Sequence, residues 1–341
     1  MTLISSALHV GIFEDHCLGG DIILKTGFLE NSIEHREFDY RNIAKEIGID
    51  AMNHRLIKEA IGCDLVFVGK GELIKPSSLK AIKKSGSLVA IWYGDHRPKP
   101  EPWLMKNLGE CDALFMSSAG ETLKEYFQRG RPNRAAFYLN PSRPDIVDEY
   151  SEIPRSVEPP IYTAKVNPFM GEEREKVYEH LCKRGDIQIV GSPNTYIRNP
   201  LLRKLYLKVR PVEFIRGRRY IEKIIRSRFG IGVSSFQNVK YYASDRLTHY
   251  LNFGKLFLAY RFPGCEDLFQ DGVHVVYYDD IKDLGEKINF YKDNQEMAEK
   301  IGAKGQEKIL TEYNAKNMVK MMMEILLNGD SSMFPWIEIL S

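Results

Sequence analysis

The chain has 341 residues, of which 43% are hydrophobic and 28% are charged. This composition is typical of folded globular proteins and excludes collagen-like, fibrous and wholly disordered chains. No apolar run approaches the roughly 18–20 residues that a membrane-spanning helix needs. The five cysteines lie far apart with no CxxC pair, and no basic stretch precedes the first apolar run. We therefore expect a cytoplasmic protein with reduced thiols, no zinc site and no signal peptide.

Charge is unevenly distributed along the chain. The formal net charge is only +2, yet the segment 198–228 carries eleven Lys and Arg residues against two Glu, a local charge of +9. The rest of the chain is therefore mildly acidic. A basic face on such a protein favours a polyanionic partner, such as phosphate groups, nucleic acid or an anionic membrane surface. The alternative is a set of solvated helix residues whose aliphatic stems cover the core.

In the first half of the chain, short apolar runs alternate with helical patterns. Strands are predicted, in chain order, at 8–13, 63–69, 87–94, 113–117 and 135–139. Helices are predicted from about residue 21 and at 52–62, 76–85 and 120–129. Short buried strands separated by helices indicate βαβ units and a parallel sheet.

A proline-rich stretch without periodicity interrupts this alternation at 150–160, and the alternation then resumes. Strands are predicted next at 160–164, 186–191, 230–235, 256–260 and 274–278. Helices are predicted at 171–184, 244–253, 281–293, 294–310 and 314–327. The pattern predicts two Rossmann-like parallel-sheet domains whose ligands lie in a cleft between them, at the carboxyl ends of the strands.

We place the domain boundaries by these breaks. The prediction is an N-terminal, acceptor-side domain over 1–150, a linker over 151–160 and a C-terminal donor domain over 161–312. The last helix and apolar tail, 313–341, could pack back on the N-terminal domain.

The segment 244–280 is the most informative. Ser244 or Asp245 can cap a helix that presents Arg246 and His249 on one face. A Pro–Gly turn follows the next strand, with Glu266 just beyond it. An arginine in the first turn of a helix suits a phosphate, because N–H groups and the guanidinium both point at the anion. An ordinary helix–strand unit would give the same pattern.

This segment resembles the donor-binding end of GT-B glycosyltransferases, in particular the CgeB/YkvP-like group. That group carries Arg-x-x-Glu-x-x-x-x-Gly, a strand, a Pro–Gly turn, an acid and a Tyr-x-Asp segment. The matching residues here are Arg246, Gly254, Pro263, Gly264, Glu266 and Asp279. The family's ribose-binding glutamate falls on His249, a weaker partner for a ribose hydroxyl. The resemblance implies a nucleotide-sugar donor, UDP-linked, and says little about the acceptor.

Asp95 is the candidate catalytic base. It follows the predicted strand 87–94 and is flanked by His96 and Arg97. An acid at the carboxyl end of a parallel strand is well placed for general base catalysis, although Asp is also a common turn residue. This stretch resembles the Asp-x-Arg-x-Pro segment of phage DNA β-glucosyltransferases, in which the aspartate is the base. The opening of the second domain resembles theirs as well, and Arg174 matches a donor-phosphate arginine.

Gly19 and Gly20 follow the first predicted strand, where GT-B enzymes keep a glycine loop close to donor phosphates and acceptor. The pattern is not GxGxxG and lacks a later strand-end acid, which disfavours a dinucleotide-dependent dehydrogenase. Walker A, HExxH and GxSxG sequences and carboxylate-rich metal loops are also absent.

The sequence thus predicts a glycosyltransferase that inverts the anomeric centre and requires neither cofactor nor metal. One alternative is a phage-type enzyme that glycosylates hydroxymethylated bases in duplex DNA, with His96, Arg97, Arg216, Arg218 and Arg219 contacting acceptor or polyanion. A glycan or small glycoside is the other acceptor class, and the basic segment could instead meet a membrane surface. A third possibility is a non-catalytic nucleic-acid-binding protein on the same fold.

Overall fold

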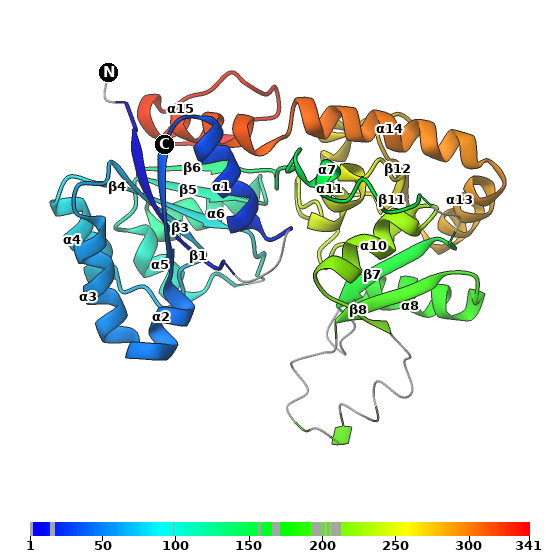
Figure 1. Ribbon diagram of the computed structural model, residues 1–341, viewed down its shortest axis with the longest axis horizontal. Helices are drawn as coiled ribbons and strands as arrows, with labels where there is room; N and C mark the ends of the chain where they lie inside the picture. The colour runs from blue at the N-terminus through cyan, green and yellow to red at the C-terminus, as the bar shows by residue number, and fades with distance from the viewer. Residues whose placement is uncertain are drawn as a thin grey trace. The chain divides into compact units, whose positions relative to one another are not determined.

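In the computed structural model the chain forms two α/β units (Figure 1). The structure describes residues 3–13, 18–97, 99–155, 158–165, 171–192, 199, 201–202, 205 and 213–341. Unit 1 comprises residues 1–143, 239–241 and 312–341, and unit 2 comprises residues 144–238 and 242–311.

Unit 1 is built on a seven-stranded sheet of order β13-β6-β5-β4-β3-β1-β2. All neighbouring strands are parallel except β13, which runs antiparallel to β6. The strands are β1 (Ser6–Gly11), β2 (Glu34–Asp39), β3 (Leu65–Gly69), β4 (Leu88–Tyr93), β5 (Ala113–Met116), β6 (Arg134–Phe137) and β13 (Ile339–Leu340). The central strands β3 and β5 are buried along their whole length, as expected for a parallel sheet covered on both faces.

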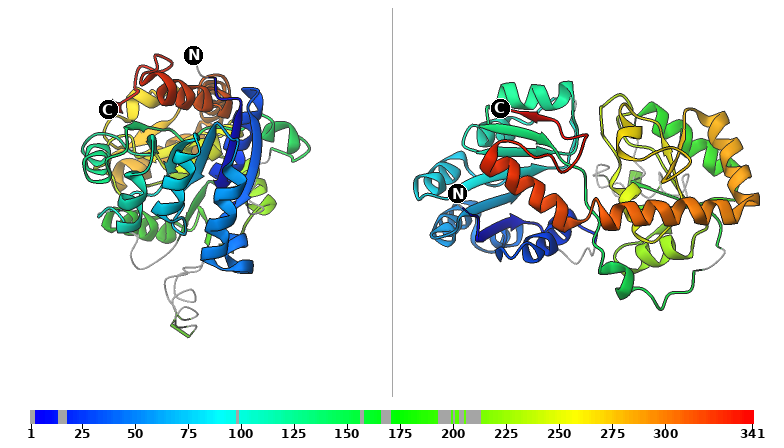
Figure 2. Two further views of the ribbon diagram at one scale, coloured as in Figure 1. Left: turned by 90° about the vertical axis from the view of Figure 1, so that its left-hand side faces the viewer. Right: turned by 90° about the horizontal axis from the view of Figure 1, so that it is seen from above.

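The helices of unit 1 are α1 (Gly20–Glu30), α2 (Tyr40–Ile47), α3 (Ile49–Ala60), α4 (Pro76–Lys84), α5 (Pro102–Leu108), α6 (Glu121–Gly130) and α15 (Ala315–Asn328). Helix α15 lies against α1 (Figure 2). Gly27 permits this contact, because a Cβ there would lie 2.3 Å from the carbonyl oxygen of Ala315. The last part of the chain thereby belongs to the same unit as the first.

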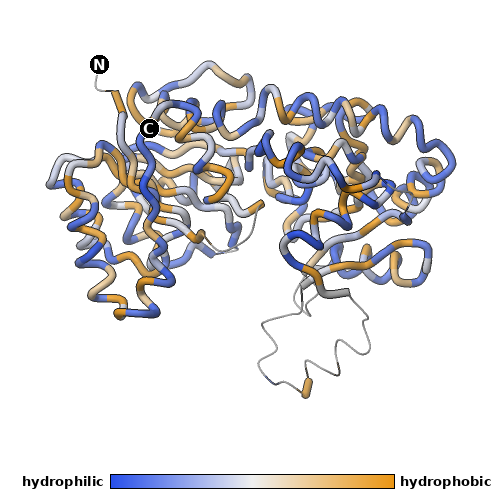
Figure 3. The backbone as a smooth tube through the Cα atoms, viewed as in Figure 1, coloured by the Kyte–Doolittle hydropathy of each residue, from blue (hydrophilic) through white to orange (hydrophobic). Residues whose placement is uncertain are grey.

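Unit 2 contains a six-stranded parallel sheet of order β12-β11-β10-β7-β8-β9. Its strands are β7 (Ile161–Lys165), β8 (Gln188–Ser192), β9 (Glu213–Phe214), β10 (Gly230–Gly232), β11 (Phe257–Tyr260) and β12 (Val276–Tyr278). Its helices are α7 (Ile146–Glu149), α8 (Glu172–Arg184), α10 (Arg218–Arg226), α11 (Asp245–Asn252), α12 (Cys265–Leu268), α13 (Ile281–Asp293) and α14 (Gln295–Thr311). Buried residues recur every three or four positions along α14, at Ala298, Ile301, Gly305 and Ile309, as expected for a helix with one buried face. Both apolar and polar residues are seen along this helix in Figure 3.

Each sheet has one point where the strand order reverses. In unit 1, β1 pairs with β2 on one side and β3 on the other, and in unit 2, β7 pairs with β8 and β10. Connections leave such a strand pair in opposite directions, which opens a crevice at the carboxyl ends where open α/β sheets bind ligands. The carboxyl ends of the strands at these two switch points are therefore candidate ligand-binding sites.

The expectation of two parallel-sheet α/β domains is confirmed, with local differences from the predicted elements. The predicted strand 230–235 ends at Gly232, because the carbonyl of Val233 accepts from an arginine and not from a neighbouring strand. The structure adds elements that were not predicted, namely β2, α2, α5, α7, β9, α10 and α12, and the predicted apolar tail contains β13.

Candidate active site

Arg246 spans the switch point of unit 2. Its Nη2 donates to the carbonyl oxygen of Val233 at 2.9 Å, and its Nη1 donates to the carbonyl oxygen of Thr163. Its Nε donates to Ser244 Oγ at 2.8 Å. Arg246 therefore joins the middle of β7 to the residue that follows β10, and all three of these acceptors are uncharged.

A second arginine, Arg174, reaches the same edge from the first turn of α8. Its residue is only 8% exposed, and Nη1 donates to Ser235 Oγ, three residues beyond β10, at 2.9 Å. Its buried Nε–H has no acceptor among the described residues. Within the same part of the chain, neither Arg174 nor Arg246 forms an ion pair with a carboxylate.

The electrostatics of this pair favour a bound anion. Burial lowers the pKa of the Arg174 guanidinium, and the positive charge of Arg246 lowers it further. An anion at this edge would relieve the repulsion and accept the N–H that Arg174 leaves unbonded. A phosphate or diphosphate suits two guanidiniums placed at strand ends beside a helix N-terminus.

Helix α11 begins at Asp245, but the predicted side-chain cap is wrong for Ser244, which makes no cap hydrogen bond. Its Oγ accepts from Arg246 instead. His249 contacts Tyr220 of α10, with His249 Nδ1 and the Tyr220 hydroxyl 3.2 Å apart and the rings edge to face. Burial raises the pKa of Tyr220 to about 12, so this hydroxyl stays protonated at neutral pH.

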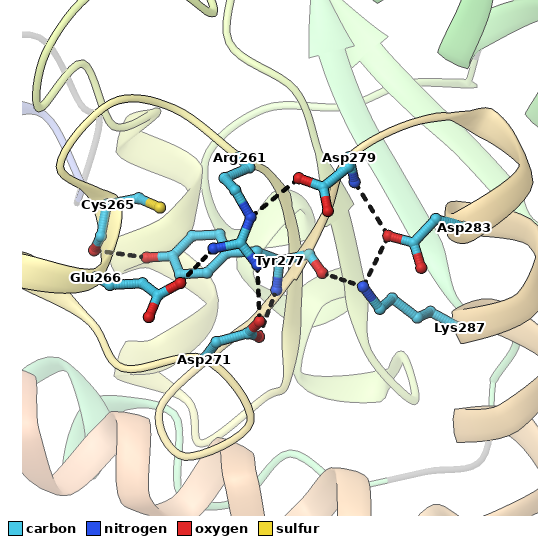
Figure 4. Close-up of polar contacts among 8 residues, drawn as sticks. All are labelled: Arg261, Cys265, Glu266, Asp271, Tyr277, Asp279, Asp283 and Lys287. Atoms are coloured by element: carbon cyan, nitrogen blue, oxygen red, sulfur yellow. Dashed lines mark hydrogen bonds and ion pairs between the residues drawn. The ribbon is translucent and has the colours of Figure 1, made fainter.

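Glu266 lies on α12, where its carboxylate pairs with Arg261. Arg261 follows β11 and also pairs with Asp271 and Asp279, each at 2.9 Å (Figure 4). Its guanidinium lies 5.2 Å from the centre of the Tyr277 ring. This cluster links the turn after β11 to the segment after β12. The Glu266 carboxylate is already paired with Arg261 inside unit 2.

Asp95 lies two residues beyond β4, in unit 1. Its Oδ2 is 2.7 Å from Nζ of Lys70, which directly follows β3, and 3.8 Å from Nη2 of Arg97. The side chains of Asp95 and Lys70 are 43% and 33% exposed, so a solute can reach the pair. The structure thus places Arg97 near Asp95, as the sequence suggests, and adds Lys70, which was not predicted.

His96 and Arg97 continue the same loop. Burial lowers the pKa of His96, which keeps its ring neutral at pH 7. The Nε of Arg97 lies 3.8 Å from Oε1 of Glu101. Their proposed contact with an acceptor remains a prediction.

Gly19 and Gly20 lie at the N-terminus of α1. Packing explains the second glycine, because a Cβ on Gly20 would lie 2.3 Å from Cη2 of Trp92. The Trp92 ring also packs edge to face on Tyr138, with centroids 5.7 Å apart. A role for the two glycines in binding a donor remains a prediction.

Sequence reasoning missed a chain of buried titratable groups at the switch point of unit 1. Asp21 is 5% exposed, and its Oδ2 accepts from the Ile12 N–H at 2.8 Å. Its Oδ1 lies 3.0 Å from Nε2 of the fully buried His9, whose Nδ1 lies 3.0 Å from Nε2 of His35. A Cβ on Gly69 would lie 2.0 Å from Asp21 Oδ1, so glycine makes room here. The sequence signal that could have identified this group is Asp21, an acid directly after Gly19 and Gly20.

Much of the basic segment falls outside the described residues, namely Arg198, Arg203, Lys204, Lys208 and Arg210. Arg216, Arg218 and Arg219 are exposed around the start of α10. Arg218 pairs with Glu152 at 2.7 Å and Glu222 at 2.9 Å, so unit 2 itself offsets one of these charges. A polyanion-binding face stays a prediction.

The described residues contain neither a candidate membrane span nor a candidate metal-binding group. No helix there has the length and apolar character to cross a membrane. In the same ranges, no three His, Cys, Asp or Glu residues are grouped so that they could hold a metal ion.

Comparisons with known proteins bear on both units. Residues 174–324 match the family model described as glycosyl transferase-like. The structure of OtsA superposes with a TM-score of 0.62 at 12% identity over 94% of this chain and 98% of that one. The Anabaena protein HepE in complex with UDP and glucose gives a TM-score of 0.58 at 12% identity, covering 95% and 99% of the two chains.

A third similar structure is a glycosyltransferase from Rickettsia africae, with a TM-score of 0.59 at 14% identity over 96% of this chain and 100% of that one. The chain has the GT-B fold. No curated protein matches the sequence. At these identities the structural likeness establishes the fold alone, and the narrower resemblances to the CgeB/YkvP-like group and to phage enzymes stay predictions.

Proposed function

We propose that this GT-B chain is a glycosyltransferase that moves a sugar from a UDP-linked donor to an acceptor hydroxyl. The observation that carries the proposal is the pair Arg174 and Arg246 at the switch point of unit 2. Two guanidiniums without carboxylate partners among the described residues, one with a buried N–H left over, call for a phosphate-bearing ligand. The glycosyl transferase-like match starts at Arg174, and HepE structures contain UDP and UDP-glucose.

The reaction we propose is a single in-line displacement. The acceptor oxygen forms a bond to the anomeric carbon while the bond from that carbon to the diphosphate breaks, and the diphosphate leaves with the bonding electron pair. Asp95 takes the acceptor proton as general base. One displacement on the opposite face inverts the anomeric centre.

Charge stabilisation in this scheme comes from the protein. The leaving diphosphate gains negative charge, and Arg174 and Arg246 supply fixed positive charge where the phosphates would lie. We expect no metal requirement on this ground, so turnover in the presence of EDTA should match turnover without it. His249, held by Tyr220, would contact the nucleotide in place of the glutamate of similar enzymes.

The test is calorimetric titration of UDP into the wild-type chain and into Arg174→Met. A charge-assisted phosphate contact contributes about 1.5–3 kcal/mol, so we expect affinity about 10- to 100-fold weaker in Arg174→Met. Arg184→Met is the matched control. It lies on the same helix but pairs with Asp186 at 3.0 Å, and it should leave the affinity unchanged.

Release of UDP from UDP-glucose by the wild-type chain then distinguishes an enzyme from a nucleotide-binding protein. Equal UDP affinity in the wild type and Arg174→Met would contradict the donor site. A wild type that shows no UDP binding at millimolar nucleotide would contradict the UDP-linked donor.

A further inference from the structure

Lys70 has a backbone conformation that a lysine rarely adopts. Its φ is +65°, in the left-handed region, and the following Gly71 has a φ of +85°. A side chain with a Cβ is strained there, whereas glycine is not. The Lys70 N–H nevertheless donates to the carbonyl oxygen of Trp92 at 2.9 Å, which fixes the turn one residue past β3. Strain of this kind at a strand end is a recurrent mark of functional sites.

In this turn the Lys70 side chain points toward the carboxyl end of β4. Strands β3 and β4 are paired in parallel, so their carboxyl ends lie side by side. Lys70 Nζ donates to Oδ2 of Asp95 at 2.7 Å, a charge-assisted hydrogen bond between residues 25 positions apart in the chain. A glycine at position 70 would adopt the turn without strain but would leave Asp95 without this partner.

Other charged and titratable groups also face Asp95. Arg97 approaches the same oxygen at 3.8 Å, and Glu101 in turn lies 3.8 Å from Arg97. Tyr93 and Tyr126 lie close enough for the Asp95 charge to help raise their pKa values, so both stay neutral phenols. His96 is neutral as well, and of the two described cations, Lys70 and Arg97, Lys70 lies nearer to the carboxylate.

A second lysine in unit 1 provides the comparison. Lys75 pairs with Asp50 at 2.6 Å, but its φ is an ordinary −85°, and the two side chains are 47% and 79% exposed. Even in this exposed pair, the hydrogen bond and the charge of Lys75 lower the pKa of the Asp50 carboxyl. The Lys70–Asp95 pair differs because its side chains are less exposed and its backbone is strained.

We propose that Lys70 is a positioning residue that holds the Asp95 carboxylate ionised and fixed at the end of β4. The proposal rests on the proposed function, in which Asp95 is the general base. A carboxylate held by a cation stays ionised to lower pH and keeps one orientation toward an incoming hydroxyl. Lys70 therefore acts through Asp95 and needs no contact with the reacting atoms.

The test measures the titration of the Asp95 carboxyl directly, which requires no knowledge of donor or acceptor. The full-length chain is labelled with [¹³C]aspartate, the Asp95 carboxyl signal is assigned by its loss in Asp95→Asn, and its chemical shift is followed with pH. In Lys70→Met and Lys70→Gly we expect the midpoint to rise by about one pH unit, because a cation within about 4–6 Å favours the charged carboxylate. Lys75→Met should leave the midpoint where it is in the wild type.

Lys70→Gly also separates positioning from a purely structural role. Because glycine relaxes the left-handed turn, Lys70→Gly should unfold at a temperature equal to or above that of the wild type. Its UDP release from UDP-glucose should nonetheless fall about tenfold at pH 7, and the acidic limb of its pH profile should move up with the Asp95 midpoint. Lys70→Arg should recover most of the activity.

An unchanged Asp95 midpoint in both Lys70→Met and Lys70→Gly would overturn the proposal. Full activity of Asp95→Asn would instead contradict the proposed base, whatever the titration shows. The two failures are distinguishable because one is read from the carboxyl signal and the other from turnover.

Discussion

His35 has a pKa lowered to about 4, chiefly by burial and then by the nearby His9. His35 lies on β2, at the more exposed end of the series of side-chain contacts His35–His9–Asp21. Asp21 in turn holds the N–H of Ile12, where the chain leaves β1. A neutral His35 therefore helps to hold Ile12, through its contact with His9 and the contact of His9 with Asp21.

This lowered pKa predicts a loss of stability in acid. The unfolded chain, with an ordinary histidine pKa of about 6.5, binds more protons than the folded chain between about pH 6.5 and pH 4. The His35 contribution to stability is therefore present above pH 6.5 and is lost as the pH falls toward 4. His35→Gln removes this contribution, so its urea midpoint should fall less than that of the wild type over that interval.

The control is His54→Gln, which replaces an exposed histidine on α3. It should keep the wild-type dependence of the urea midpoint on pH. A His35→Gln chain that loses as much stability in acid as the wild type would refute the assignment to His35.

Single residues were predictable from the sequence where local pattern or resemblance marked them. Arg174, Arg246 and Asp95 each stand in a recognisable segment. In the structure the two arginine side chains contact residues just beyond β10, and Asp95 lies just beyond β4. Lys70 and Ser235 were not predictable, because their partners lie 25 and 61 positions away in the chain. No local periodicity reports contacts of that range.

Elements were predictable where an apolar run was long enough. The continuous apolar run LVFVG identified β3, and in the structure every residue of this strand is buried. The edge strand β2 has the sequence EHREFD and pairs only with β1, so its mostly polar side chains gave no strand pattern. Strand β13 has two residues and forms only because it pairs with β6.

The start of α1 gives a prediction at this scale. Gly20→Ala would place a methyl group 2.3 Å from the Trp92 ring, at the ends of α1 and β4. Trp92 is held by Tyr138 and cannot move without losing that contact. Overpacking of this kind costs typically 1–3 kcal/mol, so we expect a loss of roughly that size in the free energy of unfolding by urea.

Gly109→Ala is the matched control, because its φ is −63° and a Cβ there would meet its nearest atom at an ordinary 3.6 Å. It should leave stability unchanged or slightly raise it. If Gly20→Ala unfolded at the same urea concentration as the wild type, the packing explanation for Gly20 would fail.

The two groups of residues that the proposed function uses belong to different units. The chain leaves unit 1 at residue 143, returns for residues 239–241 and returns again at 312. The arginine pair belongs entirely to unit 2, and the Lys70–Asp95 pair belongs entirely to unit 1. Composition and periodicity predicted two such units, whereas the short return at 239–241 has no signal in the sequence.

This division predicts where a nucleotide acts. If the arginine pair binds the diphosphate of UDP, saturating UDP should slow amide hydrogen exchange mainly in unit 2, at the start of α8 and over residues 230–246. The segments around β3 and β4 should change much less, because their charged pair binds no part of the nucleotide in the proposed site. Exchange followed by mass spectrometry checks this, with Arg174→Met at the same UDP concentration expected to lose most of the protection. Protection confined to the ends of β3 and β4 would place the nucleotide in unit 1 and refute the assignment of the donor to the arginine pair.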